Sequence, residues 1–320
     1  MLSMKALLLV VLSFSLSVPA SCDARKRENV GNSNQAGKTG SAGNSQPGKP
    51  SGDAAAGDLQ TLAQGQHSSV SNAFIFVARD VETYNALRRV VSSLPEQGEE
   101  FFKSNQVVAA FLGERRSGGY GVRFTLTGNG ALRVEESTPP KGSMTIQVIT
   151  YPFAVAAVPV GNQQSLTLEA GNAWQAMTRS YQVREGEFTM SGGITGRSEK
   201  FTFAGSVGVM REGELTTFLF NLQSRNGAKP RLLKEVASGV VKGDGRLSIA
   251  RMGAGSFVDM PADALSATGL FTDNESKLSL TFESVPGIIA DGFNGRGTLN
   301  ATTASPAPAK NKAAREDVPQ

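Results

Sequence analysis

The chain has 320 residues, with one His, one Cys and one Trp, and a formal net charge of +4. His67 and Cys22 both precede residue 68, so the rest of the chain has no Ser-His-Asp triad, Cys-His pair or His/Cys zinc site. We therefore expect no catalytic residues, no cofactor and no metal site. Residues 68–300 carry only +1 of the net charge. Nucleic-acid binding needs clustered basic charge, so nucleic acid is not an expected partner.

Residues 1–22 have the features of a secretion signal. Lys5 precedes an apolar run of 13 residues, Ala6–Val18, which is short for a bilayer span. Two processing routes remain open. Signal peptidase would cleave before Ser21, whereas a bacterial lipobox would end at Cys22 and make it the lipidated N-terminus. The position of the single Cys favours lipidation, and membrane contact would then run through the lipid. Either route predicts an extracytoplasmic protein, secreted or held at the bacterial cell envelope.

The next segment, residues 23–68, is predicted to be a flexible linker. Of the 40 residues from 28 to 67, 29 are Gly, Ala, Ser, Asn, Gln or Pro, which cannot bury enough surface to offset the entropy of ordering. The Ala/Pro/Lys-rich residues 302–320 are predicted to be a disordered tail. The intervening length suits two domains.

Residues 69–161 are predicted to form a small α+β domain. Ala73–Ala78 reads as a buried strand. Asp80 then caps a helix whose apolar residues recur at helical spacing until Pro95 stops it. Further strands follow, the second and third as a hairpin, at Gln106–Gly113, Tyr120–Leu126, Leu132–Glu135 and Thr145–Thr150.

Residues 162–301 are predicted to form an antiparallel β-sandwich or barrel, so the chain as a whole is mainly β. Short alternating runs recur between polar turns at Glu212–Glu214, Lys242–Gly245 and Asp273–Ser276. The range 230–239, with Pro at its start and Gly at its end, is predicted to contain a short helix. Trp174 is expected to fill the core of this domain or to line a ligand cavity.

Several short segments of the first domain follow one another in a characteristic order: Val107–Gly113, Ser117–Val122, Thr138–Gly142, Gln147–Phe153 and Ala157–Pro159. Their order and spacing resemble the C-terminal domain of the PrcB family of protease-complex subunits, over about residues 70–161. The resemblance implies an envelope or secreted module that binds or stabilises a protease assembly. Arg116-Ser117 departs from the Pro-Thr frequent in the family, and here a further β-rich domain follows the module.

Two segments are candidate partner-binding sites. The turn Ser117, Gly118, Gly119, Tyr120 combines adjacent glycines with an aromatic ring, and it is either a docking loop or a tight structural turn. Tyr151, Pro152, Phe153 is either a recognition surface or a strand end with packed rings.

The sequence thus predicts a non-enzymatic, envelope-anchored or secreted subunit. It would bind an extracytoplasmic protein and stabilise or regulate a protease complex. One alternative is a carrier that encloses a lipid-like ligand in the C-terminal barrel. Another is a carboxylate-based hydrolase such as a glycosidase, which needs two carboxylates facing one cleft.

Overall fold

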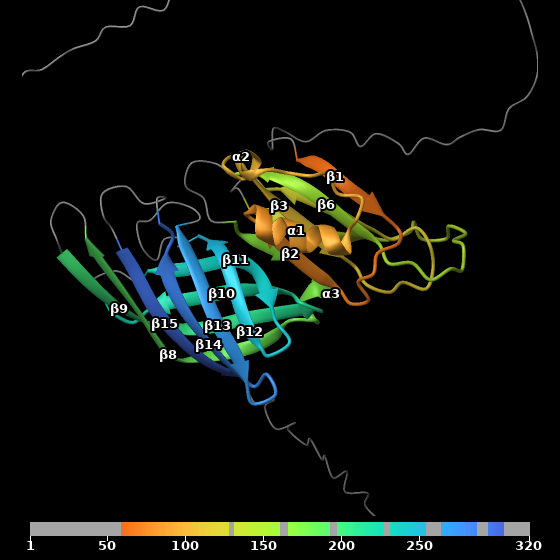
Figure 1. The fold of residues 1–320 in the computed structure, drawn as a ribbon. Helices are drawn as coiled ribbons and strands as arrows, with labels where there is room; N and C mark the ends of the chain where they lie inside the picture. The colour runs from red at the N-terminus through yellow and green to blue at the C-terminus, as the bar shows by residue number, and fades with distance from the viewer. Residues whose placement is uncertain are drawn as a thin grey trace, which may run out of the picture. The chain divides into compact units, whose positions relative to one another are not determined.

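The computed structural model describes residues 59–127, 131–160, 166–192, 197–226, 231–253, 264–286 and 294–303. These residues form a small α+β module followed by a closed antiparallel barrel (Figure 1). Both lie within one compact unit of the chain, Asp53–Gln320. The mainly β fold with an α+β module and a barrel confirms the predicted fold class.

The module is built on a four-stranded antiparallel sheet whose strand order is β1-β6-β3-β2. The two central strands are almost entirely apolar and buried, as expected for strands covered on both faces. The bounds are Gln60–Gly65 for β1, Phe74–Ala78 for β2, Asn105–Phe111 for β3 and Phe153–Pro159 for β6. Strand β1 therefore lies inside the segment that the composition predicted to be linker.

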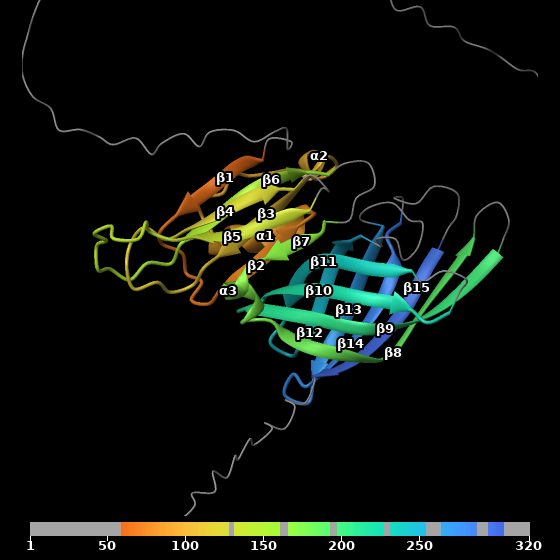
Figure 2. The ribbon, with the colours of Figure 1, turned by 180° about the vertical axis from the view of Figure 1, so that it is seen from behind.

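Two short helices follow β2. Helix α1, Val81–Val90, begins where predicted, because the Asp80 carboxylate accepts hydrogen bonds from the backbone N–H and the hydroxyl of Thr83, each at 2.8 Å. Helix α2 spans Glu99–Phe102. Helix α1 covers one face of the sheet, and the opposite face is covered by β4 and β5 (Figures 1 and 2).

A second sheet completes the module, with the order β4-β5-β7. The predicted hairpin is present as β4, Gly121–Leu126, and β5, Leu132–Ser137, while β7, Leu168–Ala170, pairs with β5 in parallel. Helix α3, Asn172–Gln175, follows and buries Trp174, whose indole Nε1 donates to the Phe111 carbonyl oxygen at 2.9 Å. Trp174 thus belongs to the core of the module, and its predicted place in the β-rich domain is wrong.

Eight consecutive strands close the barrel. Each pairs with its neighbour in the chain, and β15 pairs back onto β8. Residues alternate between the interior and the outside, which is the period-two pattern that the sequence predicted. The strands are β8 Arg179–Gly192, β9 Arg197–Glu212, β10 Leu215–Ser224, β11 Leu232–Val241, β12 Arg246–Met252, β13 Leu265–Thr272, β14 Lys277–Ser284 and β15 Asn294–Thr303.

The barrel interior is filled by side chains. Aromatic rings meet across it, with the Phe218 and Phe271 centroids 6.3 Å apart and the Phe220 and Phe282 centroids 6.1 Å apart. They belong to a cluster of buried apolar residues contributed by all eight strands. The interior of an eight-stranded barrel is just wide enough for its own side chains to fill, or for one small ligand in their place. This filled interior counts against the alternative of a ligand carrier.

Two local expectations fail. The range 230–239 contains no helix in its described part, because Leu233, Ala237 and Val241 alternate toward the barrel core as part of β11. The segment Thr145–Thr150 is not a regular strand, and only Thr150 forms an isolated bridge, with Arg115.

Strand β2 packs against the outer face of the barrel through apolar and polar contacts. Met210, Leu215 and Val236 of the barrel belong to the same buried cluster as β2. The Ile75 carbonyl oxygen accepts from Thr217 Oγ1 at 2.6 Å, and the Val77 N–H donates to Ser238 Oγ at 2.9 Å. The two barrel hydroxyl oxygens lie 2.7 Å apart. An edge of the module's sheet thus finds hydrogen-bond partners on the barrel.

Beyond β2, Arg79 forms a buried ion pair with Glu235 of β11. Their side chains are 4% and 0% exposed, and Arg79 Nε also donates to Gln106 Oε1 at 3.1 Å. The alternation of β11 places Glu235 on the same face as Leu233 and Ala237 of the barrel core.

The ion pair lies where β11 is no longer paired with β12. The ladder between β11 and β12 joins Val240 to Ser248 and Val241 to Leu247, next to the connecting turn, and does not extend to Glu235. Arg251 of β12 contacts Glu99 of α2 at 3.9 Å. Side chains of the module therefore contact both β11 and β12, the two strands on either side of the unpaired stretch.

We predict that replacing one member of this ion pair destabilises the protein more than replacing both. Arg79→Met leaves a buried carboxylate without its cation and should lower the free energy of unfolding by about 3–5 kcal/mol. Arg79→Met with Glu235→Met replaces both charges by apolar side chains and should recover most of that loss. Urea denaturation of the three chains measures the difference. A double variant no more stable than the single one would contradict this reading of the junction.

Candidate functional site

The most exposed apolar segment of the module lies in the loop between β5 and β6. Seven large apolar side chains are exposed in the described residues, and four of them are Met144, Ile146, Val148 and Ile149. Met144 is fully exposed and Ile146 is 78% exposed. We call Met144–Ile149 the apolar segment. The sequence prediction missed it as a site, because a run of β-branched residues is also what a core strand contains.

The predicted turn Ser117–Tyr120 lies directly against this segment. The Gly118 N–H donates to the Ile146 carbonyl oxygen at 3.0 Å. Gly119 has a φ of +89°, and a Cβ there would come within 3.0 Å of Pro139 Cγ. A residue with a side chain would be strained on both counts. The structure thus brings the turn and the loop together.

Arg115 fixes the base of the loop. Its Nε donates to Glu136 Oε1 at 2.9 Å, and its Nη1 donates to the carbonyl oxygens of Leu112 and Glu114, each at 2.9 Å. Its guanidinium carbon lies 5.7 Å from the centroid of the Tyr120 ring, within cation–π range. The backbones of Arg115 and Thr150 exchange two hydrogen bonds of 2.8 Å. One side chain therefore links β3, β5 and the turn.

The second predicted segment, Tyr151–Phe153, lies mainly in the core. Pro152 and Phe153 are buried, and the Phe153 ring stacks on Phe111 with centroids 6.0 Å apart. Tyr151 is half-buried, and its N–H donates to the Gln66 carbonyl oxygen at 2.7 Å. Tyr151 and Pro152 thus lead from the apolar segment into β6, which begins at Phe153.

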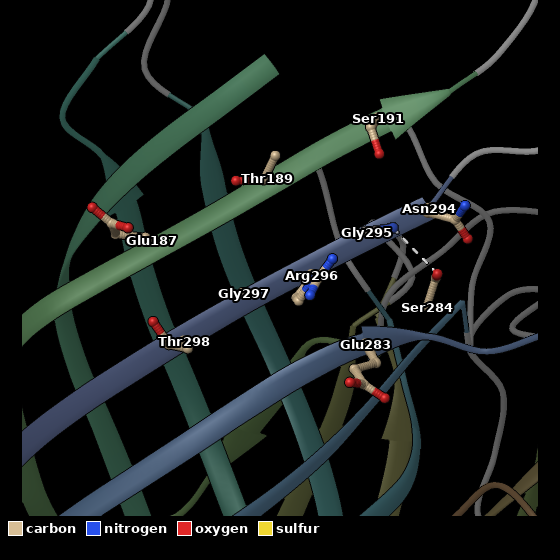
Figure 3. A pocket seen from close by; sticks show the side chains of 10 residues that line it. All are labelled: Glu187, Thr189, Ser191, Glu283, Ser284, Asn294, Gly295, Arg296, Gly297 and Thr298. Carbon is tan, nitrogen blue, oxygen red and sulfur yellow. Dashed lines mark hydrogen bonds between the residues drawn. The ribbon is translucent and has the colours of Figure 1, made fainter. Parts of the chain in front are cut away.

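A polar groove of about 620 Å³ runs over the outer face of β14, β15 and β8 (Figure 3). Its two carboxylates are Glu187 and Glu283, which are the candidates for the carboxylate pair of the hydrolase alternative. They flank β15, where their partners are Thr298 and Arg296. Strand spacing and rise place their Cα atoms about 12 Å apart. Glu187 is also turned to Lys200, with Nζ 2.9 Å from the carboxylate. A glycosidase needs two carboxyl groups facing one cleft, whereas the Glu187 carboxylate is held in an ion pair by Lys200.

The acidic turn between β13 and β14 is held by cations and not open to a metal. Asp273 contacts Lys277 at 2.5 Å, and Glu275 pairs with Arg179 and Arg211. The Tyr181 hydroxyl donates to the Glu275 carbonyl oxygen at 2.6 Å, and burial raises the pKa of that hydroxyl.

The described residues contain neither a metal-ligand cluster nor a membrane-spanning helix. They contain no group of three or more His, Cys, Asp or Glu side chains that could hold a metal ion. None of the helices in this part of the chain has the length and apolar character to cross a membrane. Cys22 and the signal segment lie outside the described residues.

Comparison with known proteins identifies the module. Residues 106–159, from β3 to β6, match the family described as PrcB C-terminal, which confirms the PrcB-like module predicted from the sequence. A search of curated proteins finds no match. Among solved structures, the chain is similar to the N-lobe domain of lactoferrin binding protein B of Moraxella bovis. The identity is 10%, the TM-score is 0.25, and the match covers 77% of this chain and 98% of that chain.

We predict that Arg115 matters more for the loop than a second arginine of the same module. Arg115→Gln removes a half-buried ion pair and two bonds to carbonyl oxygens, and it should cost about 1–2 kcal/mol of the free energy of unfolding. Arg133→Gln removes a more exposed pair with Glu169 and should cost less than about 1 kcal/mol. Chemical denaturation compares the two, and amide hydrogen exchange at Thr150 should accelerate only in Arg115→Gln. Equal effects would refute this role of Arg115.

Proposed function

We propose, from the PrcB C-terminal module at residues 106–159, that this protein is a non-enzymatic, protein-binding subunit of an extracytoplasmic protease complex. Its role is to stabilise or regulate the protease, and the module supplies the docking surface.

The observation that carries this proposal is the apolar segment within the matched range. Four large aliphatic side chains stand exposed within six residues, whereas isolated exposed apolar residues are the rule on soluble monomers. Contiguous exposed apolar surface of this kind marks interaction sites. The Gly118–Ile146 hydrogen bond and the contacts of Arg115 hold the surrounding backbone in place, so the segment stays exposed at one position on the module.

Other parts of the module are covered or buried and are not available to a partner. The barrel already covers β2 through Thr217 and Ser238. The central strands β3 and β6 are buried. In Figures 1 and 2 the coil that contains the apolar segment extends beyond the ends of β4 and β5. It is therefore the part of the module with the most accessible apolar surface.

The non-enzymatic part of the proposal rests on the residues themselves. Neither His nor Cys occurs after His67, and Glu187 of the polar groove is held in an ion pair by Lys200. The filled barrel leaves binding between proteins as the activity that the exposed surface supports best.

We predict that the apolar segment contacts the protease complex in the native bacterial host. A photoreactive amino acid at Met144 should crosslink to an extracytoplasmic protease or its subunit, identified by mass spectrometry. Adding Ile146→Asp and Ile149→Asp should lower the yield at least about tenfold, since burying unpaired charge at an interface is costly. The same photoprobe at Leu270, exposed on the barrel, is the matched control. Equal yields from both positions, or the absence of any protease component, would refute the proposal.

We further predict that Cys22 carries the anchor. Cells fed a palmitate analogue should label the wild-type protein, and Cys22→Ser should abolish the label and release the protein from the membrane fraction. An unlabelled wild-type protein recovered outside the membrane fraction would instead support cleavage before Ser21.

A further inference from the structure

The apolar segment and the residue after it have the composition of a β-strand. Residues 144–150 read Met-Thr-Ile-Gln-Val-Ile-Thr, with no Gly, no Pro and no charge. β-branched residues dominate, and they favour strands. Uncharged segments of this kind that remain exposed are prone to pair with other strands.

One backbone edge of this segment is engaged within the module. Ile146 accepts from Gly118 N–H at 3.0 Å, and Thr150 exchanges two bonds with Arg115. The Val148 N–H also donates to the Ile146 carbonyl oxygen at 3.0 Å, which closes a γ-turn around Gln147. This turn is the local reason why the segment is not a regular strand.

The other backbone edge is free. Within the described residues, no hydrogen bond involves the backbone N–H or C=O of Thr145, Gln147 or Ile149. These are alternate residues, and in an extended chain the amides and carbonyls of alternate residues point to the same side. The segment therefore offers up to three donors and three acceptors along one edge. This is the requirement for pairing with another strand.

We propose that residues 144–150 bind the partner by adding a strand to a free edge of its β-sheet, with the γ-turn at Gln147 opening as the strands pair. This rests on the proposed function, because it describes how the same segment meets the same partner. Backbone pairing supplies hydrogen bonds, and the aliphatic side chains on alternate positions select the partner's face.

Charge defines the partner further. Residues 137–150 contain Lys141 and no Asp or Glu, and Arg116 is exposed just before the adjoining turn. Glu136, just before this range, is paired with Arg115. An edge strand flanked by Asp or Glu complements this surface, whereas one flanked by Lys or Arg is repelled.

The test distinguishes binding through backbone hydrogen bonds from binding through side chains. Gln147→Pro removes the central free N–H, keeps all four exposed aliphatic residues, and suits the φ of a γ-turn. Gln147→Ala removes the same side chain and keeps the N–H. Both variants are made in the full-length chain with the photoprobe at Met144, and the crosslinked yield is measured in the native host. Gln147→Ala should retain the wild-type yield, whereas Gln147→Pro should lose about tenfold or more.

Each outcome decides the question. Equal yields from Gln147→Pro and Gln147→Ala overturn strand addition and leave docking by side chains, so the proposed function survives. No crosslink from the otherwise wild-type chain removes the proposed function and this inference together. Unchanged melting temperatures establish that both variants are folded. If Gln147→Pro is not, the comparison of Thr145→Pro with Thr145→Ala replaces it, since Thr145 also has a free N–H.

Discussion

Strand β2 serves two structures at once. It is an edge of the module's sheet, and it also packs on the barrel, where Thr217 and Ser238 bind its backbone. Arg79, just after β2, carries this contact into the barrel wall at Glu235. A buried polar network of this kind tolerates little displacement, because each group depends on its partner. The module and barrel therefore meet in one defined way, and the apolar segment remains on a surface the barrel does not use.

The sequence predicted those elements whose signals are local. Asp80 marks the start of α1, and the alternating runs between polar turns mark the barrel hairpins. The Arg79–Glu235 pair could not be predicted, because its residues are far apart in sequence and no motif around either one indicates an ion pair. The helix expected at 230–239 was wrong because Pro and Gly at its ends also suit a strand between turns. Trp174 was misplaced because it follows the predicted end of the module at residue 161, and its contact with Phe111 is not visible in the sequence.

Only one of the two parts of the candidate site, the turn, was predicted from the sequence. The glycines of Ser117–Tyr120 indicated a special turn, and the structure places that turn against the loop. The neighbouring Thr145–Thr150 was predicted to be a strand from its residue types. The structure contradicts that prediction, because only Thr150 forms a bridge. The residue types could not identify that the module leaves one of the segment's edges without a partner strand, because pairing is a property of distant residues.

The closure of the barrel by β8 and β15 has a consequence for the order of folding. Thr303 pairs with Tyr181, so the first strand of the barrel receives its second neighbour only after the last strand has been made. Contacts this distant in sequence form slowly, since a long loop must close first. Until then the barrel has two open edges, at β8 and β14. Synthesis from the N-terminus thus leaves the barrel open until its final strand is released, which sets the earliest moment at which the whole protein becomes native.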